Sequence, residues 1–269
     1  MAVRIGLILP TSTPDPARPI IGDVRAAARL AERIGVESVW ATDHLIASAP
    51  ILETTVVLAT AAAVTERILV GYNVMLPALR GVAWAAKQIA SLQLVSGNRV
   101  LLGVGTGNPA HGDIGWRAAG ASFEARGQLT DAALAALPGL VEGRPTTLAD
   151  GLEVTLSPGA PMPPVLVAGT GNRVRRRAAA HGDGWIPIAP DLTRLPAEIA
   201  RLGELAAEFG RPAPTVTVVA PALSDDPRRA AEQLTEYGAA GVERVILRPT
   251  GPDWERDYAF AADVIIVAR

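Results

Sequence analysis

Strand-like and helix-like segments alternate along this chain, and no other feature restricts its possible folds as strongly. Short apolar runs predict eight strands, at 3–9, 38–42, 68–74, 100–104, 164–167, 184–188, 215–219 and 244–247. A helical pattern follows each of them. Strands that alternate with helices are typical of a parallel sheet, and eight such pairs can close into a barrel. We therefore expect an α/β fold, a single (β/α)8 TIM barrel.

Two of the helices have clear start and stop residues. In 22–34 apolar side chains recur at steps of three and four residues, and Gly35 is expected to end that helix. The apolar face of this helix should pack on the barrel. In 227–237 a proline occupies the first helical position after Asp226, and Gly238 is expected to supply the stop.

The length and composition fit one large core. The chain has 269 residues, of which 49% are hydrophobic and 19% charged, and barrels of about 250 residues commonly form one domain. We expect residues 1–269 to form a single domain. The segment 143–163 interrupts the alternation with a strand-like stretch at 152–156 and several prolines. We interpret it as an excursion, which should lie at the bottom face of the barrel unless it wraps over the top.

Charge and cysteine content exclude several classes of function. The formal net charge of −2 gives no basic surface for nucleic acid, and no apolar run suggests a membrane span. The first ten residues lack the features of a secretory leader, so a cytoplasmic location is expected. The chain has no cysteine, and its three histidines, His44, His111 and His181, are too scattered for a local metal motif. No metal site is expected.

The clearest candidates for chemistry are Asp43 and His44, directly after the predicted strand at 38–42. Residues just past the C-terminal end of a barrel strand line the active-site mouth, so an acid and an imidazole would face a ligand there. The alternative interpretation is that Asp43 caps the next helix and His44 fills a polar niche. Trp40 lies within the strand and is expected to fill the core.

Two predicted strands end in the same four residues, Gly-Thr-Gly-Asn, at 105–108 and 169–172. Glycines let the backbone approach a ligand closely, and the first turn of a helix favours a phosphate. The second copy runs into a helix that opens with Arg173, where a cation opposes the helix dipole unless an anion is held. We expect a phosphate at 169–173, the alternative being that the arginines form a solvated face. Neither copy fits the Gly-x-Gly-x-x-Gly dinucleotide pattern.

Six segments taken together resemble the bacterial luciferase-like superfamily. These segments are 31–35, 38–44, 65–68, 86–92, 96–107 and 181–185. Members of that superfamily are barrels that bind flavin mononucleotide (FMN) or the deazaflavin coenzyme F420, and they often pair as dimers. The resemblance covers most of the chain and implies the same fold and a homodimer.

The resemblance also implies roles for particular positions. It places Asp43 and His44 at the reactive ring of the cofactor, and a non-proline cis peptide bulge at Asn73–Val74 behind that ring; from the residues alone, core packing is equally plausible for Val74. Gly105–Asn108 would flank the ring, and Gly169–Arg173 would hold the phosphate. The candidate cofactor-binding residues are Asn73, Val74, Gly105, Thr106, Gly107, Asn108, Gly169, Thr170, Gly171, Asn172 and Arg173.

The resulting functional hypothesis is an F420-dependent oxidoreductase that transfers a hydride on an unidentified small organic substrate. His44 is expected to act in acid/base chemistry or to contact the ring, and Asp43 to orient His44 or bind the ligand. One position departs from some relatives, since Asn108 stands where they carry a glutamate acid and an amide cannot donate a catalytic proton. Two alternatives remain, an FMN-dependent monooxygenase and a non-catalytic cofactor-binding protein.

Overall fold

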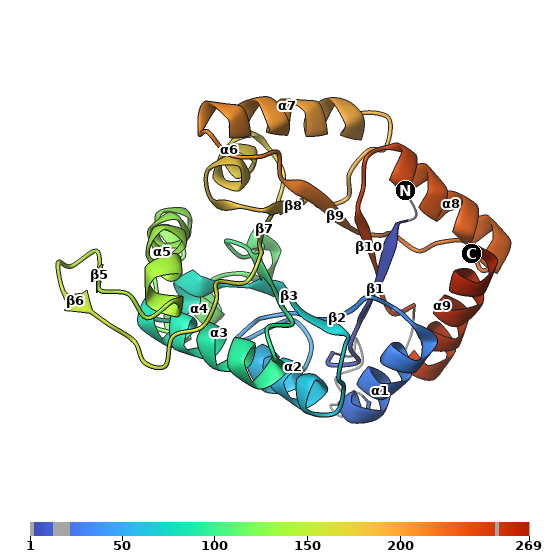
Figure 1. The fold of residues 1–269 in the computed structure, drawn as a ribbon, viewed down its shortest axis with the longest axis horizontal. Helices are drawn as coiled ribbons and strands as arrows, with labels where there is room; N and C mark the ends of the chain where they lie inside the picture. Colours follow the sequence, from blue (N-terminus) through green and yellow to red (C-terminus); the bar gives the residue numbers. More distant parts are fainter. Residues whose placement is uncertain (1–2, 13–21, 251–252, 269) are drawn as a thin grey trace.

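The computed structural model describes residues 3–12, 22–250 and 253–268, and its centre is a closed barrel of eight parallel strands (Figure 1). Each strand lies within two residues of its predicted ends, so the expected TIM barrel is confirmed. In sheet order the strands are β1 (Arg4–Ile8), β2 (Ser38–Ala41), β3 (Leu69–Met75), β4 (Val100–Val104), β7 (Val165–Ala168), β8 (Gly184–Ile186), β9 (Thr215–Val219) and β10 (Arg244–Leu247), which closes on β1.

Helices surround the barrel on its outside (Figure 1). They are α1 (Val24–Ile34), α2 (Thr54–Ala63), α3 (Val82–Ser96), α4 (Ile114–Ala118), α5 (Arg126–Val141), α6 (Asn172–His181), α7 (Leu195–Glu208), α8 (Pro227–Ala239) and α9 (Trp254–Ala268), with short 3-10 turns at Pro77–Leu79 and Pro109–His111. None of the helices in the described part of the chain is both long and apolar enough to cross a bilayer.

The helix boundaries confirm one sequence prediction and correct another. At the start of α1 the Asp23 carboxylate accepts hydrogen bonds from two backbone N–H groups, and the helix ends at Gly35, whose φ is 84°, as predicted. The helix α8 was predicted to stop at Gly238, but it continues to Ala239. The left-handed residue that redirects the chain is Gly241, with φ 93°, because a glycine inside a helical turn need not end it when the next residues still bond to the helix.

Trp40 fills the centre of the barrel, as expected. Its side chain is fully buried and its Nε1 donates a hydrogen bond of 2.9 Å to the Ser38 hydroxyl. Glycines on the neighbouring strands make the room, because a Cβ on Gly71 would lie 2.2 Å from the indole and one on Gly6 would lie 2.5 Å from it. Below the indole, the buried guanidinium of Arg244 lies 5.9 Å from the ring. These buried side chains close the barrel below its mouth.

The excursion at 143–163 forms an antiparallel hairpin of β5 (Thr146–Thr147) and β6 (Glu153–Val154), which projects beyond α5 in Figure 1. The chain then passes along α3 at the bottom of the barrel. There the Gln93 amide donates to the Pro161 carbonyl at 2.8 Å and accepts from the first N–H of β4 at 3.1 Å. The excursion therefore meets the bottom face, as expected for an insertion that precedes a strand.

Three of the segments that carry the family resemblance meet at this same end. The Glu32 carboxylate of α1 accepts hydrogen bonds from the backbone N–H groups of Glu66, Arg67 and Ile68. Arg99, just before β4, donates to the Ile68 carbonyl at 2.7 Å and to the Thr65 hydroxyl at 3.0 Å. These contacts fix the loop that enters β3, so their role is structural.

Candidate active site

The four predicted site segments lie at the C-terminal ends of β2, β3, β4 and β7, which are consecutive neighbours in the sheet. All four strands are parallel, so their C-terminal ends open on the same mouth of the barrel. The structure therefore brings residues 43–44, 73–74, 105–108 and 169–173 to one opening. Their roles toward a ligand stay predictions at this point.

Asp43 is buried at 3% exposure and is bound by the chain itself. Its two oxygens accept hydrogen bonds of 2.8 Å and 2.9 Å from the Arg80 guanidinium, and Oδ2 also accepts from the Leu76 N–H at 2.8 Å. The alternative that Asp43 caps the next helix does not hold, because Glu53 caps α2 through the Val56 N–H. The carboxylate instead joins the end of β2 to the segment after β3. Arg80 could not be identified from the sequence, since nothing in its spacing indicates this partner.

His44 is half-buried at the mouth, and its ring lies edge-on to His111 with 4.5 Å between ring centroids. Both imidazoles line a small pocket together with Asn108 and Trp116. Burial lowers the pKa of His44, charge on His111 lowers it further, and the Asp43 carboxylate raises it; the net pKa lies below the ordinary value of 6.5. His44 is therefore mostly neutral at pH 7. The sequence alone indicates no role for His111 here.

The bulge predicted at the end of β3 is present. The Asn73–Val74 peptide bond is cis, and the pairing of β3 with β4 shifts register between Tyr72 and Met75. Glycines of β4 face this bulge, because a Cβ on Gly103 would lie 2.1 Å from the Tyr72 carbonyl oxygen. Likewise a Cβ on Gly105 would lie 2.5 Å from the Val74 side chain. The first Gly-x-Gly motif is thus shaped by the neighbouring strand.

The rest of that motif forms a turn that carries His111. Gly107 has φ 83° and faces the Trp116 indole, while Thr106 is half-buried beside it. The Asn108 side chain accepts a hydrogen bond of 3.0 Å from the Ala110 N–H, which caps the 3-10 turn. Asn108 therefore organises the loop, as side-chain amides commonly do at a helix start.

The second copy of the motif leads directly into α6. The Trp185 Nε1 donates to the Gly169 carbonyl at 2.9 Å, and Gly169 and Gly171 have φ of 128° and 87°. Gly171 precedes the helix without any side-chain cap, and Thr170 is exposed beside it. The first N–H groups of α6 are therefore open to an anion. The Asn172 side chain is engaged by Arg175 at 2.7 Å.

Of the four arginines in α6, Arg173 differs from the others. Arg175, Arg176 and Arg177 pair with Glu198, Glu208 and Asp131, respectively. Arg173 forms an ion pair with none of the residues that the structure describes. Its exposed side chain lines a cleft between α6 and the start of α5. The acidic side chains Glu124 and Asp131 line the same cleft, so an anion held by Arg173 would lie toward the start of α6.

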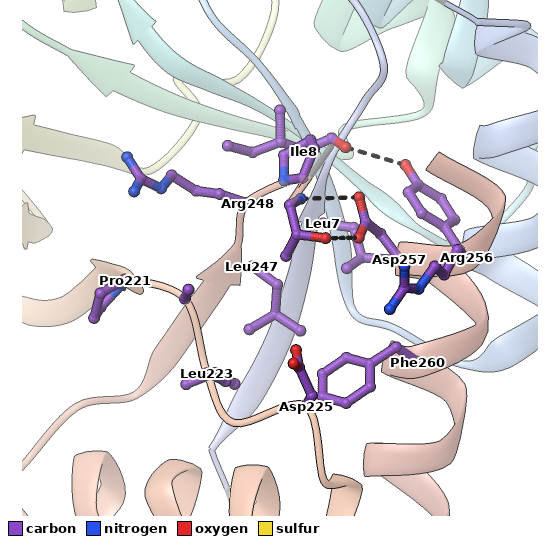
Figure 2. Close-up of a pocket in the computed structure, with 14 residues that line it drawn as sticks. Leu7, Ile8, Pro221, Leu223, Asp225, Leu247, Arg248, Arg256, Asp257 and Phe260 are labelled. Carbon is purple, nitrogen blue, oxygen red and sulfur yellow. Dashed lines mark hydrogen bonds between the residues drawn. The ribbon is translucent and has the colours of Figure 1, made fainter. Parts of the chain in front are cut away.

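A second pocket, of about 90 Å³, lies outside the barrel wall between α9 and the ends of β1, β9 and β10 (Figure 2). Its walls include Leu7, Leu247 and Phe260, and the Tyr258 hydroxyl donates to the Ile8 carbonyl at 3.3 Å. Figure 2 shows the Arg248 side chain pointing away from this pocket. The Asp257 carboxylate binds Thr250 across its edge. None of the predicted site residues lines this pocket.

A sequence model of one protein family, described as luciferase-like monooxygenase, matches residues 3–262. The chain belongs to the luciferase-like monooxygenase family. It shares 31% identity over 205 residues with an F420-dependent hydroxymycolic acid dehydrogenase of Mycobacterium tuberculosis, a match that covers 68% of this chain and 56% of the relative. It shares 28% over 250 residues with a 5,10-methylenetetrahydromethanopterin reductase of Methanolobus tindarius, covering 88% and 73%.

An uncharacterized protein of Mycobacterium tuberculosis is 35% identical over 176 residues, which is 61% of this chain and 58% of that protein. This luciferase-like family member therefore spans somewhat more than half the length of the mycobacterial relatives that it matches. An F420-dependent secondary alcohol dehydrogenase bound to an F420–acetone adduct has a TM-score of 0.83 at 19% identity over the whole of both chains. A monooxygenase from Streptomyces bottropensis has 0.82 at 17%, covering 98% and 99%. At these identities the likeness concerns the fold.

Proposed function

We propose that this luciferase-like family member is an F420-dependent oxidoreductase that transfers a hydride to or from a small organic substrate. The observation that carries the proposal is Arg173, a cation without a described acidic partner at the uncapped start of α6, on the same mouth as His44. Named relatives that use F420, among them the dehydrogenase from Mycobacterium tuberculosis, support this choice of cofactor.

The residues at the mouth fit a flat ring with an anionic tail. Half-buried apolar side chains form the upper layer of the barrel interior. They pack on a buried cluster of Trp40, Leu101, Leu166, Ile186 and Ile246. The half-buried side chains are Ile8, Val74, Ala168 and Val219. A planar ring resting there would bury apolar surface. Gly169, Gly171 and the free N–H groups of α6 offer the donors that a phosphate needs.

When bound, the deazaflavin supplies the ring carbon that exchanges the hydride. In this proposal His44 exchanges the accompanying proton at an imidazole nitrogen, because its lowered pKa leaves it largely neutral at pH 7 and able to accept. Asp43 does not need to move a proton. Its pairing with Arg80 and Leu76 holds the loop that carries His44.

An FMN-dependent monooxygenase is the second candidate. The description of the matching family, and a monooxygenase of the same fold from Streptomyces bottropensis, favour it. The same helix start would serve the FMN phosphate equally well. Consumption of oxygen with added reduced FMN would distinguish this activity, since hydride transfer through F420 requires no oxygen.

An absorbance titration of the purified protein with F420 and with FMN tests the proposal. We expect F420 to bind, and Arg173→Ala to weaken that binding about tenfold, since charge-assisted hydrogen bonds contribute roughly 1.5–3 kcal/mol. Arg176→Ala is the matched control, because Arg176 lies on the same helix but pairs with Glu208. Tight FMN binding without F420 binding overturns the choice of cofactor. Binding without turnover, unchanged by His44→Ala, supports a non-catalytic protein.

We also propose that the chain forms a homodimer. Exposed apolar side chains lie on α2 and α3, which pack against each other; Val56 is 66% exposed, Trp84 72% and Val95 66%. Large apolar side chains exposed on neighbouring helices are typical of protein interfaces. Light scattering should report a dimer, and Trp84→Asp should shift it toward a monomer. A monomeric wild-type protein at micromolar concentration contradicts this proposal.

A further inference from the structure

The proposed site contains a second histidine, His111, to which the proposed function assigns no role. His111 lies edge-on to His44, with 4.5 Å between ring centroids, and both rings line the pocket at the barrel mouth. We propose that a charge on His111 opposes protonation of His44 across this ring contact, and that His111 passes protons between His44 and solvent. The catalytic meaning of this inference rests on the proposed function, whereas the coupling itself does not.

The loop that carries His111 is built to hold it against His44. The Asn108 side chain caps the turn through the Ala110 N–H, and the His111 N–H donates to the Asn108 carbonyl at 3.1 Å. Pro109 begins the turn and Gly112, with φ 68°, ends it. The residues 108–112 therefore fix the backbone of the turn that carries His111.

Electrostatics disfavour a positive charge on both rings at once. Two imidazolium rings at this distance repel, and partial burial strengthens the repulsion. The lowered pKa of His44 agrees with that expectation. Burial is the largest cause of that lowered pKa, charge on His111 adds to it, and the Asp43 carboxylate, which is paired with Arg80, opposes it. His111 is the one other ionisable residue among those that line the pocket with His44.

The pair also accounts for Asn108 at a position where some relatives carry a glutamate acid. The amide cannot donate a catalytic proton, but it caps the turn that presents an imidazole three residues later. A proton that reaches His44 can pass to His111 and then to water, which returns His44 to its neutral form. His111 acts through His44 and is therefore a positioning and relay residue.

Histidine NMR tests the coupling without any cofactor, because the chain has only three histidines. We expect His111→Gln to raise the pKa of His44, since the repelling charge is removed. His181→Gln is the matched control and should leave the His44 titration unchanged, because His181 ends α6 at the bottom of the barrel. Asn108→Ala should also raise the pKa of His44, as His111→Gln does. Asn108→Asp keeps a hydrogen-bond acceptor at the cap. An unmoved His44 titration in both His111→Gln and Asn108→Ala overturns the inference.

The relay is tested by the pH profile of turnover once F420 binding is established. His111→Gln should lower kcat about tenfold, at the lower end of what acid/base groups contribute, and change the pH profile. The dissociation constant of F420 should stay within about twofold, because His111 is not placed on the phosphate or the ring. An unchanged profile overturns the relay. If neither F420 nor FMN binds the wild-type protein, the proposed function fails, and the NMR titration still decides the coupling.

Discussion

The Arg80 guanidinium donates two hydrogen bonds to the Asp43 carboxylate, with Nη2 2.8 Å from Oδ1 and Nη1 2.9 Å from Oδ2. The two residues come from segments after neighbouring strands, and the carboxylate is almost wholly buried. Removing the cation would leave a buried charge without its partner. Arg80→Ala should therefore lower the free energy of unfolding by about 3 kcal/mol.

Urea denaturation measures this loss. The matched control is Arg176→Ala, which removes an exposed pair with Glu208 and should cost less than about 1 kcal/mol. Equal losses in the two variants would mean that the Asp43 pair behaves like a surface ion pair.

Gly71 and Trp40 should respond to mutation as a unit. A Cβ at Gly71 would lie 2.2 Å from the indole, so Gly71→Ala should destabilise the fold by about 1–3 kcal/mol through overpacking. In the double variant Gly71→Ala/Trp40→Leu the clash is removed, and the combined cost should be smaller than the sum of the single costs. Thermal unfolding of the single and double variants measures the difference. Gly81→Ala is the control, because a Cβ there meets open space.

The titration of His44 should make stability depend on pH. Its pKa in the folded chain lies below the ordinary value of 6.5, so the unfolded chain binds more protons in this range. The contribution of neutral His44 to the free energy of unfolding is then fully present above about pH 6.5, and it declines as the pH falls below that value. His44→Gln should reduce this decline between pH 7 and 5. Urea midpoints across that range test the expectation, and equal slopes for the variant and the wild type would refute it.

The ionisation of Glu32 should also make the free energy of unfolding fall in acid, but for a different physical reason. Burial raises its pKa, but three backbone N–H donors and the nearby Arg67 outweigh that effect, so the net pKa lies below 4.5. The stabilisation is present above pH 4.5 and is lost as the pH falls below it. Glu32→Ala should cost about 1–2 kcal/mol at pH 7, because donors lose their partner. The difference from the wild type should shrink in acid, and a constant difference down to pH 3 contradicts this account.

The barrel could be predicted because its strands are short apolar runs between helical patterns. Such runs gave the ends of β4, β9 and β10 correctly. The predicted end of α8 was wrong because Gly238 still bonds as part of the helix. Local composition does not show how far a helix continues.

Within the site, the segments at the barrel mouth could be predicted, because strand ends are visible in the sequence. Their partners could not. Arg80 lies 37 positions from Asp43 and His111 lies far along the chain from His44, and only the closed sheet brings them together. The cis bond at Asn73–Val74 was predicted from family resemblance and is present; its residues alone left core packing equally plausible.

The buried indole of Trp40 and the guanidinium of Arg244 beneath it block the interior of the barrel. Nothing can therefore traverse this molecule from one end to the other along its axis. Any ligand that enters at the mouth must therefore leave through the same opening.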